Sequence, residues 1–150
     1  MKKILINQFM VRFPALSRNE SMSRSAAAAF ALQCDPTVEE IAAIKTAVSE
    51  AVTNAIVHGY RDCEGMVELS MKLYADNMLY IQIKDKGRGI PNFKEAMQPA
   101  FTTAPADEER SGLGVTVMES FMDKVRVRSA EGRGTCVTLE KRLRKKGDGD

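Results

Sequence analysis

The sequence predicts an α+β fold, in which helices cover one face of a mixed, largely antiparallel sheet to form a two-layer α/β sandwich. Two segments alternate apolar and polar residues in the manner of half-buried strands. Two others open with the Ser/Thr-x-x-Glu pattern of a helix start. The chain has 150 residues, which suits one core. We therefore expect a single domain over residues 1–143 and a disordered tail over residues 144–150.

The first strand and the first helix are predicted from residues in the N-terminal part that typically end strands and start helices. Residues 4–13 have the composition of a strand, and Pro14 closes it. Ser17-Arg-Asn-Glu20 then has the form of a capping box, in which the hydroxyl and the carboxylate satisfy backbone donors at a helix start. This helix is expected to run toward Gln33, and Asp35-Pro36 ends the segment.

The second helix should be the longest element of the chain. Thr37-Val-Glu-Glu40 repeats the capping box, and the apolar pattern then predicts a helix of about twenty residues from Val38 to near His58. Gly59 is placed to act as its C-cap.

The remaining elements are mostly strands. Residues 66–74 and 79–85 alternate in polarity, and residues 75–78 are expected to form the hairpin turn between them. After a segment interrupted by prolines, a helix is predicted from about residue 113 to 122. Two final strands are expected at 124–130 and 135–143, joined by residues 131–134.

Composition and charge exclude several classes of protein. The net charge is +2, but residues 141–150 alone carry +3, so the rest of the chain is at −1 and gives no indication of a nucleic-acid partner. Three cysteines, Cys34, Cys63 and Cys136, are far apart and are read as reduced thiols of a cytoplasmic protein. Asn7 and Gln8 interrupt the apolar start, so we expect no signal peptide and no membrane segment.

The most informative segment is Glu50-Ala-Val-Thr-Asn54, because its carboxylate and its carboxamide share one face of the predicted helix. The amide oxygen of Asn54 is a hard neutral ligand of the kind that completes Mg²⁺ coordination when phosphates and waters fill the other positions. A carboxylate at Glu50, near bound phosphates, can orient a nucleophile and accept its proton. Packing remains an alternative for Asn54, and support of the metal shell through water remains one for Glu50.

Asp85-Lys-Gly87-Arg-Gly89 directly follows a predicted strand and indicates a base-binding site. The Asp85 carboxylate can accept a hydrogen bond from the exocyclic amine of adenine, whereas guanine offers an oxygen there. Gly87 and Gly89 allow the backbone to approach the base closely. The motif alone would also fit an ordinary turn.

A second glycine motif, Ser111-Gly-Leu-Gly114, precedes the last predicted helix. Backbone amides at that helix start would face a triphosphate, and Arg110 is a candidate to balance its charge. Neither a Walker P-loop nor a Rossmann glycine fingerprint occurs in the chain.

The order of these motifs, completed by Gly134-Thr135, resembles the GHKL superfamily of ATP-binding proteins, which includes histidine kinases, gyrase-type ATPases and heat-shock chaperones. The segments Val48–Tyr60, Arg110–Gly114 and Asn19–Arg24 are similar to its branch of anti-sigma serine kinases from spore-forming bacteria. The resemblance implies a Bergerat-type ATP-binding domain, with residues 93–110 as a lid that nucleotide orders.

By this resemblance, Asn54 is the Mg²⁺ ligand and Glu50 the general base. The nucleotide-binding residues would be Asn54, Asp85, Gly87, Gly89, Arg110, Ser111, Gly112, Leu113, Gly114 and Thr135. The cofactors implied are ATP, converted to ADP, and Mg²⁺. The partners implied are a sporulation sigma factor and an anti-anti-sigma protein phosphorylated on serine.

The resemblance further implies a cytoplasmic homodimer in which Arg24 contacts both partners. Neither Ala27 nor Ala28, three and four residues later, offers Arg24 an acidic partner, so we expect an unpaired, exposed arginine. Three alternatives remain at this point: a related stress-response anti-sigma kinase, a sequestering module that transfers no phosphate, and a stand-alone ATPase piece of a larger machine.

Overall fold

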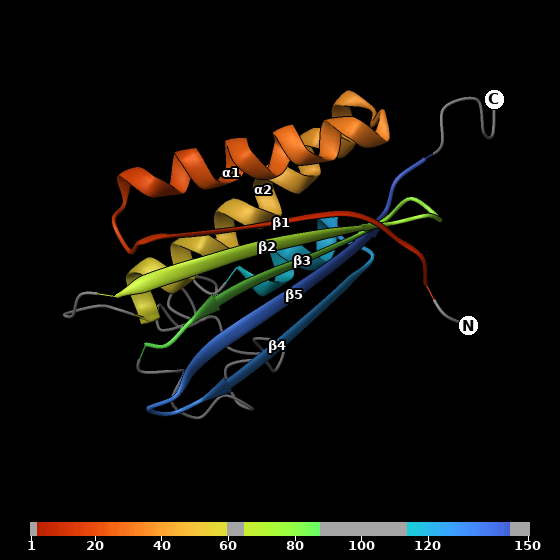
Figure 1. Ribbon diagram of the computed structural model, residues 1–150. Helices are drawn as coiled ribbons and strands as arrows, with labels where there is room; N and C mark the ends of the chain where they lie inside the picture. Colours follow the sequence, from red (N-terminus) through yellow and green to blue (C-terminus); the bar gives the residue numbers. More distant parts are fainter. Residues whose placement is uncertain (1–2, 60–64, 88–113, 145–150) are drawn as a thin grey trace.

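A computed structural model describes residues 3–59, 65–87 and 114–144. Its elements form two layers, with α1 and α2 lying across one face of a sheet and α5 on that same side (Figure 1). The predicted α+β two-layer fold is confirmed. Within the described ranges, no helix has the length and apolar character needed to cross a bilayer.

The sheet has five strands in the order β1-β2-β3-β5-β4, and each neighbouring pair is antiparallel. The strands are β1 (Leu5–Pro14), β2 (Met66–Tyr74), β3 (Met78–Asp85), β4 (Lys124–Ala130) and β5 (Gly134–Arg142). All five lie within a residue or two of the predicted ranges, because alternation of polarity marks the buried face of each strand.

The helical elements are α1 (Arg18–Ala31), the 3₁₀ turn η1 (Leu32–Cys34), α2 (Val38–Asn54), the π-helical turn η2 (Ala55–Gly59) and α5 (Val115–Phe121). The expected continuous helix to near His58 therefore changes character after Asn54. A π turn widens the backbone and is frequent at functional sites.

The two predicted capping boxes have different outcomes. At the start of α2, Thr37 Oγ1 accepts from the Glu40 amide at 3.1 Å, and Glu40 Oε1 accepts from the Thr37 amide at 2.9 Å. The box predicted at Ser17 is wrong, because Ser17 itself has helical torsions and makes no side-chain cap. The carboxylate of Glu20 contacts other side chains, described below.

The core lies between the sheet and the helices. It is made of aliphatic side chains from the inner faces of β2, β3 and β5 and from α2 and α5. The largest fully buried ones include Ile44, Leu69, Met71, Leu79, Ile81, Ile83, Met118 and Leu139. Burial of such side chains is the main favourable contribution to folding.

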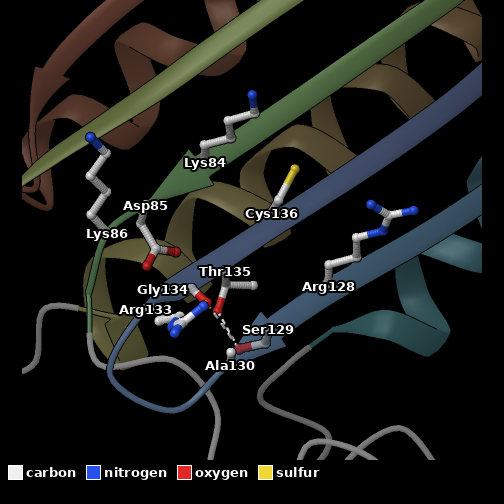
Figure 2. A pocket seen from close by; sticks show the side chains of 10 residues that line it. All are labelled: Lys84, Asp85, Lys86, Arg128, Ser129, Ala130, Arg133, Gly134, Thr135 and Cys136. Carbon is white, nitrogen blue, oxygen red and sulfur yellow. Dashed lines mark hydrogen bonds between the residues drawn. The ribbon is translucent and has the colours of Figure 1, made fainter.

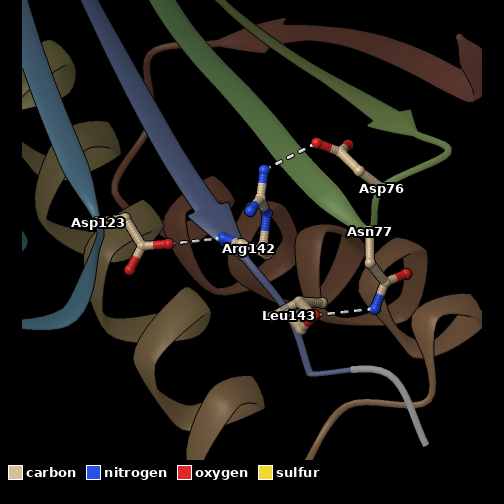
Figure 3. A network of polar contacts seen from close by, with 5 residues as sticks. All are labelled: Asp76, Asn77, Asp123, Arg142 and Leu143. Carbon is tan, nitrogen blue, oxygen red and sulfur yellow. Dashed lines mark hydrogen bonds and ion pairs between the residues drawn. The ribbon is translucent and has the colours of Figure 1, made fainter. Parts of the chain in front are cut away.

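Polar contacts tie the C-terminal end of β5 to the rest of the sheet (Figure 3). The Arg142 amide donates to Asp123 at 2.7 Å, and its guanidinium contacts Asp76 at 2.9 Å. Asn77, which has a positive φ of 65° in the β2–β3 turn, donates to the Leu143 carbonyl at 3.1 Å. These contacts lie at the end of the β3–β5 pair opposite Asp85 and Thr135.

Candidate nucleotide-binding and catalytic site

Helix α2 places Glu50 and Asn54 one turn apart at its C-terminal end. Its buried stripe, Ala43, Ile44, Ala47, Val48, Ala51 and Val52, follows helical spacing and packs into the core. This packing fixes the rotation of the helix, so both polar side chains lie beside the core and are half-buried. The amide oxygen of Asn54 is buried. The predicted sharing of one helix face is therefore seen.

Gly114 lies against the side chain of Glu50. It has a φ of 66° at the N-cap of α5, and its carbonyl accepts from the Met118 amide at 2.8 Å. A Cβ added at Gly114 would overlap the Glu50 carboxylate and would lie 3.0 Å from its Cδ. Only glycine allows both this torsion and this approach. The last glycine of the Gly-Leu-Gly motif is thus brought to Glu50.

Asp85 ends β3 and is only 8% exposed. Its Oδ1 accepts from the Gly87 amide at 3.0 Å, and the backbone of Thr135 also hydrogen-bonds to the carboxylate. Burial raises the pKa of Asp85, although these two hydrogen bonds act in the opposite direction. The carboxylate is therefore fixed in place by backbone donors.

Thr135 and Gly134 complete this end of the sheet. Thr135 is the direct partner of Asp85 in the β3–β5 ladder, and its hydroxyl lies 2.8 Å from that of Ser129. Gly134 has a φ of 99°, and a Cβ there would lie 2.7 Å from the Lys86 Cα. Close approach of two backbones requires glycine at this position.

A hollow of about 330 Å³ opens beside these residues (Figure 2). Its lining includes Asp85, Gly134 and Thr135 together with four cations, Lys84, Lys86, Arg128 and Arg133. From sequence, Gly134 was predicted only as part of the Gly134-Thr135 motif, and its close approach to β3 was not predicted. A glycine directly before a polar strand residue was the available signal.

The two groups of residues lie at the same end of the domain. The turn η2, which directly follows Asn54, contacts both β3 and β5, the strands that carry Asp85 and Thr135. Helix α5, which starts at Gly114, packs on α2. Glu50, Asn54 and the strand ends are thus joined through neighbouring elements, as a nucleotide between helices and sheet would require.

Part of the predicted site lies outside the described residues. These positions are Gly89, Arg110, Ser111, Gly112 and Leu113, together with the whole of the expected lid at residues 93–110. Of the residues predicted to contact the nucleotide through backbone or hydroxyl groups, the described ones are Gly87, Gly114 and Thr135.

Arg24 is not an unpaired arginine, which corrects the expectation from sequence. Its guanidinium lies 3.8 Å from Oε1 of Glu20, one turn earlier on α1. The Glu20 carboxylate also accepts a hydrogen bond from the hydroxyl of Ser49, the residue before Glu50 on α2. The guanidinium side chain remains 42% exposed. A signal was present, because Glu20 precedes Arg24 by four residues, the favoured order for an ion pair on a helix.

Asn54 and Glu50 can supply only part of the coordination shell of Mg²⁺. Among the described residues, no three His, Cys, Asp or Glu side chains gather around a possible metal position. Mg²⁺ bound with a nucleotide usually keeps waters and phosphate oxygens and takes few protein ligands. One carboxamide oxygen with a carboxylate one turn away fits that requirement.

A family model described as a histidine kinase-like ATPase domain matches residues 13–141. The chain is similar to solved structures of this class. It matches the RsbU and RsbW domains of a Mycobacterium tuberculosis protein with a TM-score of 0.67 and 22% identity, over 92% of this chain and 32% of that one. It matches the mycobacterial sensor histidine kinase MprB with a TM-score of 0.53 and 18% identity, over 90% and 99%.

Curated relatives are more similar in sequence. The anti-sigma F factor of Priestia megaterium is 51% identical over 138 residues, covering 91% of this chain and 93% of the relative. That of Bacillus subtilis is 51% identical over 140 residues, covering 93% and 94%. The chain therefore belongs to the histidine kinase-like ATPase family and, within it, to the anti-sigma F factors. The resemblance stated from the motifs is confirmed.

Proposed function

We propose that this protein is a serine-protein kinase as well as an anti-sigma factor. With ATP bound it captures a sporulation sigma factor, and it transfers phosphate to a serine of an anti-anti-sigma protein. The observation that supports this most is the position of Glu50, whose carboxylate lies against Gly114 and one turn from Asn54. A general base beside a phosphate-binding glycine motif is what phosphoryl transfer requires.

In this proposal Asp85 binds the adenine amine, and Thr135 supports it from the neighbouring strand. Burial and two backbone donors hold the Asp85 carboxylate with one orientation, which favours adenine over guanine. Gly87, Gly89 and the segment Arg110–Gly114 would contact the nucleotide through backbone and cationic groups.

Asn54, with phosphate oxygens and waters, would hold Mg²⁺, which supplies charge neutralisation at the phosphates. Glu50 accepts the proton of the acceptor serine as its Oγ bonds to the γ-phosphorus. The bond from that phosphorus to the bridging β–γ oxygen breaks, and ADP leaves. Glu50 is half-buried, and Ser49, the residue before it on α2, contacts Glu20 of α1.

Arg24 is proposed to contact both protein partners, in a homodimer that acts in the cytoplasm, where sigma factors meet RNA polymerase. Its guanidinium is held on α1 by Glu20 and is still 42% exposed. Interface arginines of this kind often contribute much of the binding free energy.

The proposal is tested by incubating the protein with labelled Mg-ATP and a candidate anti-anti-sigma protein. We expect label on a serine of the partner. Label that appears only as free phosphate would indicate an ATPase. Nucleotide-dependent capture of a sigma factor with no label transferred would indicate a sequestering module, and would contradict the kinase assignment.

A further inference from the structure

A hollow of about 310 Å³ lies beside α2 on the side that faces α1. Its lining consists of Arg24, Ala42, Lys45, Thr46, Ser49 and Glu50. The five α2 residues recur at three- and four-residue intervals, so they form one stripe of that helix. The hollow therefore joins the proposed partner-binding arginine to the proposed general base.

The stripe has the length of a short peptide segment. From Ala42 to Glu50 it extends about 12 Å along the helix axis, at about 1.5 Å per residue. An extended chain rises about 3.3 Å per residue, so three to four residues span this length. Ala42, Thr46 and Ser49 have small side chains, which leaves room for a backbone to lie on the helix.

The charges in the lining are unequal. Glu50 is the one acidic residue of the lining, and Arg24 and Lys45 are both cationic. Arg24 has Glu20 as a partner, whose carboxylate is further held by Ser49. No ion pair of Lys45 is found within the described part of the chain, and its helix neighbours three and four residues away are Ile41, Ala42, Val48 and Ser49. Lys45 thus adds an uncompensated positive charge to the hollow.

We propose that this hollow docks the acceptor segment of the substrate, and that Lys45 is a specificity residue which binds a carboxylate close to the acceptor serine. The inference rests on the proposed kinase function and names the substrate class. Lys45 precedes Glu50 by five residues, about 7.5 Å along the axis, which corresponds to about two residues of extended chain. The acidic residue therefore lies about two positions from the serine that reaches Glu50.

The first test uses synthetic serine peptides with one Asp placed one or two positions from the serine, and matched peptides with Asn. With the full chain and Mg-ATP, we expect the best Asp peptide to have a KM about two- to fivefold lower than its Asn counterpart, with similar kcat. Lys45→Gln should remove this preference and leave kcat nearly unchanged. Lys45→Glu should reverse it toward a peptide with Lys in place of Asp.

Lys72→Gln is the matched control, because Lys72 is also an exposed lysine, on β2, and the substitution changes net charge by the same amount. It should retain the preference for Asp. Lys45 is exposed, so its variants should fold, which thermal unfolding checks. Equal KM values for the Asp and Asn peptides, or an equal loss of preference in Lys72→Gln, would overturn the docking inference while phosphate transfer still supports the kinase function.

A binding measurement tests the docking site independently of the kinase function. Fluorescence anisotropy of labelled peptides, with a non-hydrolysable ATP analogue present, reports docking without transfer. A preference for Asp that depends on Lys45 would support the docking site even if no phosphate reached a peptide or protein, in which case only the kinase assignment would fail. Peptides that do not bind, or that bind equally to the parent and to Lys45→Gln, would overturn the docking proposal.

Discussion

The backbone of Gly114 lies against the carboxylate of Glu50, so a Cβ there would be 3.0 Å from the Glu50 Cδ and 3.1 Å from its Cβ. We expect Gly114→Ala to lower the free energy of unfolding by about 1–3 kcal/mol and to weaken ATP binding. Urea denaturation and calorimetry measure the two effects. Gly132→Ala is the control, because Gly132 also has a positive φ, 79°, but its Cβ would have no neighbour within 4 Å. Equal effects of the two substitutions would show that contact with Glu50 is unimportant.

Asp85→Asn should weaken ATP binding by about 1–3 kcal/mol, because one acceptor oxygen becomes a donor while the shape is kept. The Gly87 amide, which donates to Oδ1 at 3.0 Å, would also lose a charged acceptor. Calorimetric titration with ATP measures the change. Asp76→Asn, at the opposite end of β3, is the control and should bind like the parent. Unchanged affinity in Asp85→Asn would contradict the adenine assignment.

Asp85 should also make stability depend on pH. Burial raises its pKa above 3.8, so between 3.8 and the pKa of the folded state the folded protein binds more protons than the unfolded chain. The contribution of Asp85 to the unfolding free energy therefore falls as pH rises through this window. We expect the stability of the parent relative to Asp85→Asn to decrease over the same range. Urea denaturation at pH values on both sides of 3.8 tests this, and a difference that rises with pH would contradict it.

Glu50→Gln should separate catalysis from binding. It removes the proton acceptor but keeps the size of the side chain, so phosphate transfer should fall about 100-fold or more while Mg-ATP still binds. Asn54→Ala should instead weaken the binding of Mg-ATP itself, because it removes the buried amide oxygen. Transfer rates with the anti-anti-sigma protein and titrations with Mg-ATP give both values. Equal transfer rates in the parent and Glu50→Gln would leave Glu50 with no role as a base.

Arg24→Ala should weaken capture of both the sigma factor and the anti-anti-sigma protein by at least about 1–2 kcal/mol, with ATP affinity unchanged. The exposed part of the guanidinium is available to a partner even though Glu20 lies 3.8 Å away. Binding of purified partners, with ATP and Mg²⁺ present, measures the loss. Arg126→Ala on β4 removes an equally charged exposed residue and is the control. Normal binding of both partners would exclude a shared surface at Arg24.

Most of the fold could be predicted because polarity alternation and turn residues record burial directly. The strands and the start of α2 at Thr37 follow from such local patterns. The π turn after Asn54 could not be predicted, because the apolar residues Ala55 and Ile56 fit an α-helix equally well. The capping box predicted at Ser17 is absent, and the Glu20 carboxylate contacts Ser49 and Arg24. A local sequence pattern cannot show these contacts, because Ser49 lies on another helix.

The candidate site could be predicted only in part for the same reason. Glu50 and Asn54 are close in sequence, so helical spacing relates them directly. The approach of Gly114 to Glu50 spans more than sixty positions and depends on how α5 packs on α2. The hollow around Lys45 also requires two helices to be placed side by side. No local pattern contains that information.

Asp85 and Thr135 are paired directly across β3 and β5. The positions of both side chains at the proposed adenine site therefore depend on the register of the hydrogen-bond ladder between those strands. Side chains alternate between the two faces of a strand, so a slip of β5 by one residue would turn Thr135 outward and bring Cys136 inward. The same slip would turn the core residues Val137 and Leu139 outward, so the pairing of β5 stabilises the core as well as placing Thr135. An error in this strand pairing during folding would therefore lower the stability of the protein and weaken ATP binding together.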